Sequence, residues 1–253
     1  MEKEIQNKIR YGLVGKDIAY SFSRSYFSEK FKNEGIITCS YENFDLEYIE
    51  QIKEVLKADN LGGLNVTIPY KETIIPYIDE LSEEAKIIGA VNTIRFLPNG
   101  KIEGHNTDAY GFKTALLKQL DSHAAKALIL GTGGASKAIK YVLGQLNIEP
   151  LFVSRNPKKG QISYEQIDSD VMQAHLLIIN CTPLGTHPEV NKAPAIPYES
   201  ISSKHFLFDL IYNPELTLFL KEGKKRGATI ENGLLMLEQQ AEKSWNIWTE
   251  ASD

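Results

Sequence analysis

Apolar residues recur with two different spacings in the first 120 residues. Short apolar or alternating runs are typical of strands, and apolar residues three or four positions apart are typical of helices. The runs predict strands at residues 10–15, 36–44, 64–68, 90–97 and 101–104. The wider spacing predicts helices at about 26–35, 46–56, 82–88 and 108–120, and Asn99-Gly100 is typical of a hairpin turn. This alternation indicates an α/β domain over residues 1–107.

The rest of the chain repeats the alternation around a glycine-rich turn. Four apolar residues, 127–130, lead into the turn, and the apolar positions after it predict a helix at 137–146. Further strands are predicted at 151–154, 176–180, 206–211 and 228–230, with a helix at 217–226. The pattern predicts a doubly wound, Rossmann-type α/β domain over residues 108–232. A last apolar stripe predicts a closing helix within 233–253, which we expect to pack back on the first domain.

The glycine-rich turn fits a dinucleotide site. Gly131, Gly133 and Ser136 match the G-x-G-x-x-small spacing. The first glycine allows the sharp turn, the second lets a pyrophosphate approach the backbone, and the small third residue lets helix and strand pack closely. The candidate phosphate-binding residues are Gly131, Thr132, Gly133, Gly134, Ala135 and Ser136, since N–H groups at a helix start face the phosphates. The alternative is a structural turn without a ligand.

The end of the next strand favours NADP as the cofactor. An NAD site usually has Asp or Glu there to hold the ribose hydroxyls. This chain has Ser154-Arg155-Asn156, with two lysines close behind. A guanidinium can grip the 2′-phosphate of NADP with two hydrogen bonds. The alternative is a solvated basic loop.

Composition and charge exclude several classes of partner. The 253 residues carry a net charge of −5 and no long basic run, which argues against nucleic acid. No apolar run reaches the roughly 18 residues of a membrane span. The two cysteines, Cys39 and Cys181, are too few for a disulfide framework, and no ligand cluster has the spacing of a metal site. We therefore expect a cytoplasmic enzyme without metal, monomeric or homodimeric, that acts on a small molecule.

Several short sequence motifs follow one another along the chain in an order typical of one enzyme family. They are Gly15-x-x-Ile-x-x-Ser-x-Ser23, Asn65-Val-Thr-Ile-Pro-Tyr-Lys71, Gly89-Ala-Val-Asn-Thr93, Gly104-His-Asn-Thr-Asp108, Asn180-Cys-Thr-Pro-Leu-Gly185 and Gly233-x-x-Met-Leu-x-x-Gln-Ala241. Together with the glycine turn, they resemble the shikimate dehydrogenase family over nearly the whole chain. The resemblance implies reversible reduction of 3-dehydroshikimate to shikimate by NADPH, a step of chorismate and aromatic amino acid biosynthesis. It also implies a substrate domain, a Rossmann domain and a C-terminal helix that returns to the first domain.

Reduction of a ketone leaves an alkoxide that needs a proton from a positioned acid. Lys71 follows Pro69, which ends a predicted strand, so we expect its ammonium group at a strand tip facing a cleft between the domains. Asp108 begins a predicted helix and is expected to pair with it. Similarity to the family supports both catalytic roles. The alternatives are a solvated surface lysine and a helix-terminal carboxylate that faces the macrodipole.

The family resemblance also implies the residues that bind substrate and cofactor. Ser21 and Ser23, on one side of the chain if that loop is extended, would bind the substrate carboxylate. The residues expected to contact the ring hydroxyls are Asn65, Thr67, Asn92 and Gln240, because amides and hydroxyls both donate and accept. The residues expected near the nicotinamide are Tyr212, which could also flank the substrate, Gly233 and Met236, and Thr182 is a further candidate for binding the cofactor. The alternative for each is an ordinary cap, turn or helix-surface residue.

Two other functions remain open on the sequence. One is a broader quinate/shikimate dehydrogenase that uses NAD as well as NADP. The other is a dinucleotide-sensing binding protein that has lost catalysis, although the polar residues that the reaction needs are present.

Overall fold

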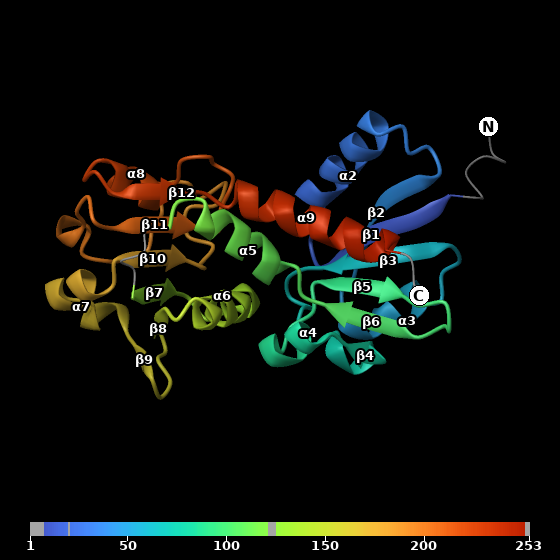
Figure 1. Cartoon of the computed structure of the whole chain (residues 1–253), viewed down its shortest axis with the longest axis horizontal. Helices are drawn as coiled ribbons and strands as arrows, with labels where there is room; N and C mark the ends of the chain where they lie inside the picture. Colours follow the sequence, from blue (N-terminus) through green and yellow to red (C-terminus); the bar gives the residue numbers. More distant parts are fainter. Residues whose placement is uncertain (1–7, 20, 121–124, 251–253) are drawn as a thin grey trace. The chain divides into compact units, whose positions relative to one another are not determined.

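The computed structural model of the chain describes residues 8–19, 21–120 and 125–250, which form two compact units (Figure 1). The first unit comprises the described residues up to Thr107 together with those from Ala241 onward. The second unit is Asp108–Gln240. Each unit contains one six-stranded sheet with helices packed against it, so the α/β fold class predicted from the sequence is confirmed. Residues 251–253 of the predicted closing helix lie outside the described ranges.

The first unit has a mixed sheet. Its strands are β1 (Ile9–Gly15), β2 (Cys39–Asp45), β3 (Leu61–Val66), β4 (Glu80–Leu81), β5 (Thr93–Phe96) and β6 (Ile102–His105), in the order β2-β1-β3-β5-β6-β4. Strand β1 is parallel to β2 and β3, whereas β5 is antiparallel to β3 and β6. The predicted hairpin at Asn99-Gly100 is confirmed, with Gly100 at φ +81° in the left-handed region that favours glycine.

Helices cover both faces of this sheet. They are α2 (Phe22–Asn33), α3 (Ile52–Val55), α4 (Glu83–Ile88) and the last turns of α9 (Leu234–Thr249), with 3₁₀ turns η1 (Ile49–Gln51) and η2 (Ile75–Tyr77). On one face, α2 and α9 bury an aromatic core in which the Tyr11 and Trp248 rings stack at 4.9 Å. Trp248 lies against Gly63 of β3, where a Cβ would overlap the indole. The small residue therefore lets α9 pack closely on the sheet.

Two helices of this unit differ from the sequence prediction. The helix expected over 46–56 is wrong in length, because only η1 and the single turn of α3 form. The amide of Leu46 donates to Gly15 O at the end of β1, so Leu46 continues the pairing of β2 with β1 instead of beginning a helix. Helix α2 begins at Phe22 rather than near residue 26, so Ser23 lies in a helix and not in an extended loop.

The second unit has a parallel sheet. Its strands are β7 (Lys126–Leu130), β8 (Glu149–Val153), β9 (Gln161–Ile162), β10 (Leu177–Asn180), β11 (Phe206–Asp209) and β12 (Thr229–Glu231), in the order β12-β11-β10-β7-β8-β9. The chain begins in the middle of the sheet at β7 and adds β8 and β9 on one side. It then returns past β7 and adds β10, β11 and β12 on the other side. This is the doubly wound Rossmann order, and the strand order reverses between β7 and β10.

The helices of the second unit fill the crossovers. They are α5 (Asp108–Leu117), α6 (Gly134–Gln145), α7 (Ser169–Ala174), α8 (Leu218–Lys224) and the first turns of α9, with 3₁₀ turns η3 (Tyr164–Gln166) and η4 (Tyr198–Ser200). The sequence analysis missed β9 and α7, although Asp168 caps α7 by accepting the amide of Val171 at 2.9 Å. Among the helices of the described ranges, none is long and apolar enough to cross a membrane.

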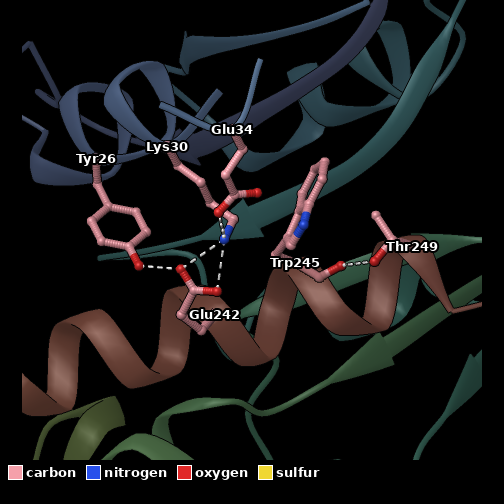
Figure 2. Close-up of polar contacts among 6 residues, drawn as sticks. All are labelled: Tyr26, Lys30, Glu34, Glu242, Trp245 and Thr249. Atoms are coloured by element: carbon pink, nitrogen blue, oxygen red, sulfur yellow. Dashed lines mark hydrogen bonds and ion pairs between the residues drawn. The ribbon is translucent and has the colours of Figure 1, made fainter. Parts of the chain in front are cut away.

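The C-terminal part of α9 is tied to α2 by a partly buried ionic contact (Figure 2). Glu242 accepts hydrogen bonds from the Tyr26 hydroxyl and, at 2.9 Å, from the ammonium group of Lys30. Lys30 also binds Glu34 at 2.7 Å, and its side chain is only 11% exposed. The contact therefore fixes which face of α9 meets the first sheet.

Candidate functional site

The glycine turn lies at the carboxyl end of β7, next to the point where the strand order reverses. Gly131 has φ +103°, and its amide donates to Val153 O at the end of β8 at 3.0 Å. A Cβ on Gly131 would lie 3.1 Å from Cγ2 of Thr182, which follows β10. The turn is thus held between the ends of two neighbouring strands, where Rossmann folds bind their ligands.

Helix α6 presents an open N-terminus at this turn. It begins at Gly134, three residues before the predicted start, with Gly133 as its N-cap. A Cβ on Gly133 would meet no described atom within 4 Å, and the residues of the first turn include no acid by sequence. Ser136 is buried and its hydroxyl donates to Gly133 O at 2.7 Å. Because the first amides of a helix lack intrahelical acceptors, this end of α6 fits a pyrophosphate.

The basic loop that the sequence associates with NADP directly follows β8. Arg155 and Asn156 are exposed, and the amide of Asn156 donates to Ser154 Oγ at 3.2 Å. The bond from Gly131 to Val153 places this loop one residue beyond the strand end that holds the glycine turn. The structure therefore brings the glycine turn and the loop of the candidate 2′-phosphate ligand close together along the backbone.

A buried polar network supports Thr182 on the other side of the turn. Its amide and hydroxyl donate to Asn180 Oδ1 at 3.0 and 2.6 Å. Asn180 in turn donates to Asp209 at 3.0 Å, and the Thr217 hydroxyl donates to Asp209 at 2.6 Å. Burial raises the pKa of Asp209 to about 6. The hydrogen bonds that Asp209 accepts lower the pKa, but their effect is smaller than that of burial. The sequence analysis did not single out Asp209, because one acid in an apolar strand carries no spacing signal.

The raised pKa of Asp209 predicts how stability depends on pH. Between about pH 4 and 6 the folded chain keeps a proton on Asp209 that the unfolded chain releases, so this residue's contribution to stability falls as the pH rises through that range. We expect the stability of Asp209→Asn relative to the natural chain to rise by on the order of 2–3 kcal/mol from pH 4 to pH 7. Urea unfolding of both proteins across this range measures the difference. Parallel pH profiles would contradict the assignment.

In the first unit, the two candidate carboxylate ligands lie at the start of α2. Ser21 is the N-cap residue, and its Oγ is buried without a hydrogen-bond partner among the described residues. Ser23 is buried in the first helical turn. The argument that an extended loop aligns the two serines is therefore wrong, and the helix start brings them together instead. A helix N-terminus favours an anion, and the first turn includes no acid by sequence.

Five buried residues form a polar cluster on the same unit: Asn65, Asn92, Thr93, Thr107 and Ser244. Asn92 Oδ1 accepts the amide of Thr107 at 2.7 Å, and its Nδ2 donates to the Thr107 hydroxyl at 3.0 Å. Asn65 Nδ2 donates to Ser244 Oγ at 2.9 Å. The sequence predicted both asparagines but missed the three hydroxyl residues. Ser244 carries a signal that was overlooked, because it is a polar residue within the apolar stripe of α9.

The two candidate proton-transfer residues adjoin this polar cluster through the backbone. The carbonyl of Lys71 accepts the amide of Val91, the residue before Asn92, at 2.7 Å. Asp108 is buried and directly follows Thr107, whose amide is bound to Asn92. Thr67 follows β3, and its carbonyl accepts the amide of Tyr70 in the turn that leads to Lys71. Hydrogen bonds within the first unit thus fix the backbone around Lys71 and immediately before Asp108.

The remaining candidates lie in the second unit around α9. Gln240 is buried and donates to Leu237 O at 2.9 Å, and Met236 is buried one turn earlier. A Cβ on Gly233 would overlap the carbonyl of Leu210, so close approach of two backbone segments explains this glycine. Tyr212 follows β11, and partial burial raises the pKa of its hydroxyl.

Comparisons with known proteins agree with both halves of this arrangement. Residues 13–94 match the family model of the shikimate dehydrogenase substrate binding domain. The chain is 40% identical to the shikimate dehydrogenase (NADP(+)) of Methanosphaera stadtmanae, over 94% of this chain and 90% of that protein. A crystal structure of a shikimate dehydrogenase with NADP+ superposes with a TM-score of 0.86 at 32% identity, covering 98% of this chain and 92% of the other. The enzyme of Thermus thermophilus, solved with NADP(H) and shikimate, gives 0.83 at 30% identity and covers 96% and 94%.

Proposed function

The chain belongs to the shikimate dehydrogenase family, and we propose that it reduces 3-dehydroshikimate to shikimate, reversibly, with NADPH. The observation that carries the proposal is the pairing of two sites in one chain. One unit has an open helix N-terminus at the strand-order reversal of a Rossmann sheet. The other has a buried polar cluster and a buried hydroxyl, Ser21 Oγ, that lacks a partner among the described residues. This step belongs to chorismate and aromatic amino acid biosynthesis.

The cofactor proposal rests on the fit of the second unit to NADP. Residues 131–136 would hold the pyrophosphate at the start of α6, and Arg155, with Ser154 and Asn156, would bind the 2′-phosphate. Thr182, Gly233 and Met236 would line the nicotinamide end. When bound, NADPH supplies the hydride that reduces the substrate ketone. The chain's part is to orient the ring and to keep water away from it.

We assign proton transfer to Lys71 and Asp108. Reduction of the carbonyl places negative charge on its oxygen, and an ammonium group can donate the proton that neutralises it. The carboxylate of Asp108 would orient the Lys71 ammonium group and stabilise its charged form. In the reverse direction, neutral Lys71 would accept the proton of the substrate hydroxyl as the hydride leaves. The burial of Asp108 and the hydrogen bonds that anchor the neighbouring backbone support this assignment.

The substrate proposal divides the polar residues between the carboxylate and the ring hydroxyls. Ser21 and Ser23 would bind the carboxylate at the N-terminus of α2, where the helix dipole favours an anion. Asn65, Thr67, Asn92 and Gln240 would bind the hydroxyls, with Tyr212 beside the ring. The unmet hydrogen-bonding capacity of Ser21 Oγ supports the first half of this division, because a buried hydroxyl without a partner is costly.

A spectrophotometric assay with two substrates and two cofactors tests the function. We expect NADP to be reduced with shikimate, and reduction with quinate or with NAD to be much slower. Comparable rates in all four combinations would favour the broader quinate/shikimate dehydrogenase. A protein that binds NADPH but never oxidises it with 3-dehydroshikimate would contradict the proposal and favour a dinucleotide-sensing protein.

We also propose that the protein acts in the cytoplasm as a monomer or homodimer. Cys39 and Cys181 are both free thiols, as is usual in a reducing compartment.

A further inference from the structure

One hydroxyl on α9 reaches three segments of the first unit. Ser244 is fully buried, and its Oγ lies 2.9 Å from Asn65 Nδ2, 2.8 Å from Thr93 Oγ1 and 3.1 Å from Thr107 Oγ1. These partners belong to β3, β5 and the segment after β6. A serine within a helix often bonds a carbonyl of the preceding turn. The contacts of Ser244 with the three segments join the helix to the polar cluster.

The donors and acceptors of Asn65 determine the orientation of its amide. The Tyr41 hydroxyl donates to Asn65 Oδ1 at 2.8 Å. The Nδ2 group must then face Ser244, which accepts at 2.9 Å. Contacts of Nδ2 with Asn92 O and with the Thr93 hydroxyl are longer, at 3.3 Å. The two amide hydrogens of Asn65 thus have partners, while Oδ1 accepts from Tyr41 alone among the described residues and keeps its second lone pair.

Further hydrogen bonds connect Ser244 with the second asparagine, Asn92. Ser244 accepts from Asn65, and its Oγ lies 2.8 Å from the Thr93 hydroxyl. Thr93 donates to Asn92 Oδ1 at 3.1 Å, beside the backbone amide of Thr107. These contacts link the two amides through Ser244 and Thr93.

We infer that Ser244 is a positioning residue of the substrate site: it holds Nδ2 of Asn65 so that Oδ1 accepts a hydrogen bond from a hydroxyl of the substrate ring. This inference rests on the proposed function, which assigns Asn65 to the ring hydroxyls. Without the serine hydroxyl, Nδ2 keeps only its longer contacts. The amide can then rotate, and it presents the accepting oxygen to the substrate for only part of the time.

Two other contacts hold α9 on the sheet when the Ser244 hydroxyl is removed. Glu242 remains bound to Tyr26 and Lys30, and the indole of Trp248 donates to Ile94 O at 2.9 Å. Thr249, on the same helix, offers a matched control, since its exposed hydroxyl donates to Trp245 O at 2.8 Å without touching the polar cluster (Figure 2).

Steady-state kinetics with shikimate and NADP test the inference. In Ser244→Ala we expect the KM for shikimate to rise roughly 3- to 10-fold, the range of one net hydrogen bond, with kcat within about twofold and the KM for NADP unchanged. Thr249→Val should behave as the natural protein. Ser244→Cys keeps roughly the side-chain volume, but its sulfur is a weak acceptor for Asn65 Nδ2, so it should show the same rise; it replaces the alanine variant if that variant fails to fold.

A double-mutant cycle asks whether Ser244 acts through Asn65. We expect Asn65→Ala/Ser244→Ala to have the same KM for shikimate as Asn65→Ala alone, because the serine then has no amide to hold. Additive rises would overturn the inference, as would an unchanged KM in a folded Ser244 variant. If the natural protein itself fails to reduce NADP with shikimate, the proposed function is wrong. Normal activity of the natural protein with an unaffected Ser244 variant overturns the inference alone.

Discussion

Replacement of Lys71 by alanine is expected to lower kcat for shikimate oxidation by about 10²–10⁴-fold, the usual contribution of a general acid–base group. The reaction would lose the group that exchanges a proton with the substrate oxygen, while the cofactor-binding residues of the second unit stay intact. The KM for NADP should therefore change little. The measurement is the initial rate of NADP reduction at saturating substrate, together with NADPH binding followed by fluorescence.

Lys86 provides a matched control for Lys71. It also lies in the first unit, and its exposed ammonium group binds Glu83 on α4. Lys86→Ala should keep the natural kcat, since an exposed ion pair adds little to stability. A Lys71→Ala protein that is as active as Lys86→Ala would remove Lys71 from the mechanism. Asp108→Asn should lower kcat in the same way if the carboxylate supports the lysine.

Replacement of Arg155 by alanine is expected to lower kcat/KM for NADPH by roughly 10- to 100-fold and to leave the value for NADH nearly unchanged. The two cofactors differ in the 2′-phosphate, and hydrogen bonds to charged groups each contribute about 1.5–3 kcal/mol. The ratio of the two kcat/KM values, measured with 3-dehydroshikimate, reports the phosphate contact directly. An unchanged ratio would place the 2′-phosphate against other residues.

Lys126→Ala controls for the loss of a positive charge from the same unit. Lys126 begins β7, at the end of the strand away from the glycine turn, and its ammonium group lies 3.5 Å from Glu149. Both variants lose one positive charge, so an effect of the net charge of the unit would appear in both. A drop confined to Arg155→Ala therefore indicates a local interaction of Arg155 with the phosphate.

Features whose signal lies within one short stretch could be predicted from the sequence. The glycine turn between an apolar strand and a helix, the Asn99-Gly100 hairpin and the alternation of strands and helices are all of this kind. The spacing of apolar residues predicted the first residue of each helix less accurately. Helices α2 and α6 begin several residues early because their first turns contain polar or small residues without an apolar period.

Contacts between distant residues could not be predicted in the same way. Asn65 and Ser244 are 179 residues apart, and only the fold shows that the serine meets the amide. Asp209 acquires its raised pKa from burial, which depends on the position of β11 between β10 and β12. The site residues expected from family resemblance remain predictions, although the structure explains why several of them are buried and hydrogen-bonded.

The division of α9 between the two units has a consequence for biosynthesis. Residues 241–249 complete the core of the first unit, with Trp248 against Gly63 and Ser244 in the polar cluster. A ribosome releases all of Asp108–Gln240 before it releases these turns. Until then the first unit lacks the Trp248 ring that stacks on Tyr11, while the second unit already has its whole sequence. We therefore expect the first unit to complete its core last, in contrast to the usual N-terminal-first order of folding during synthesis.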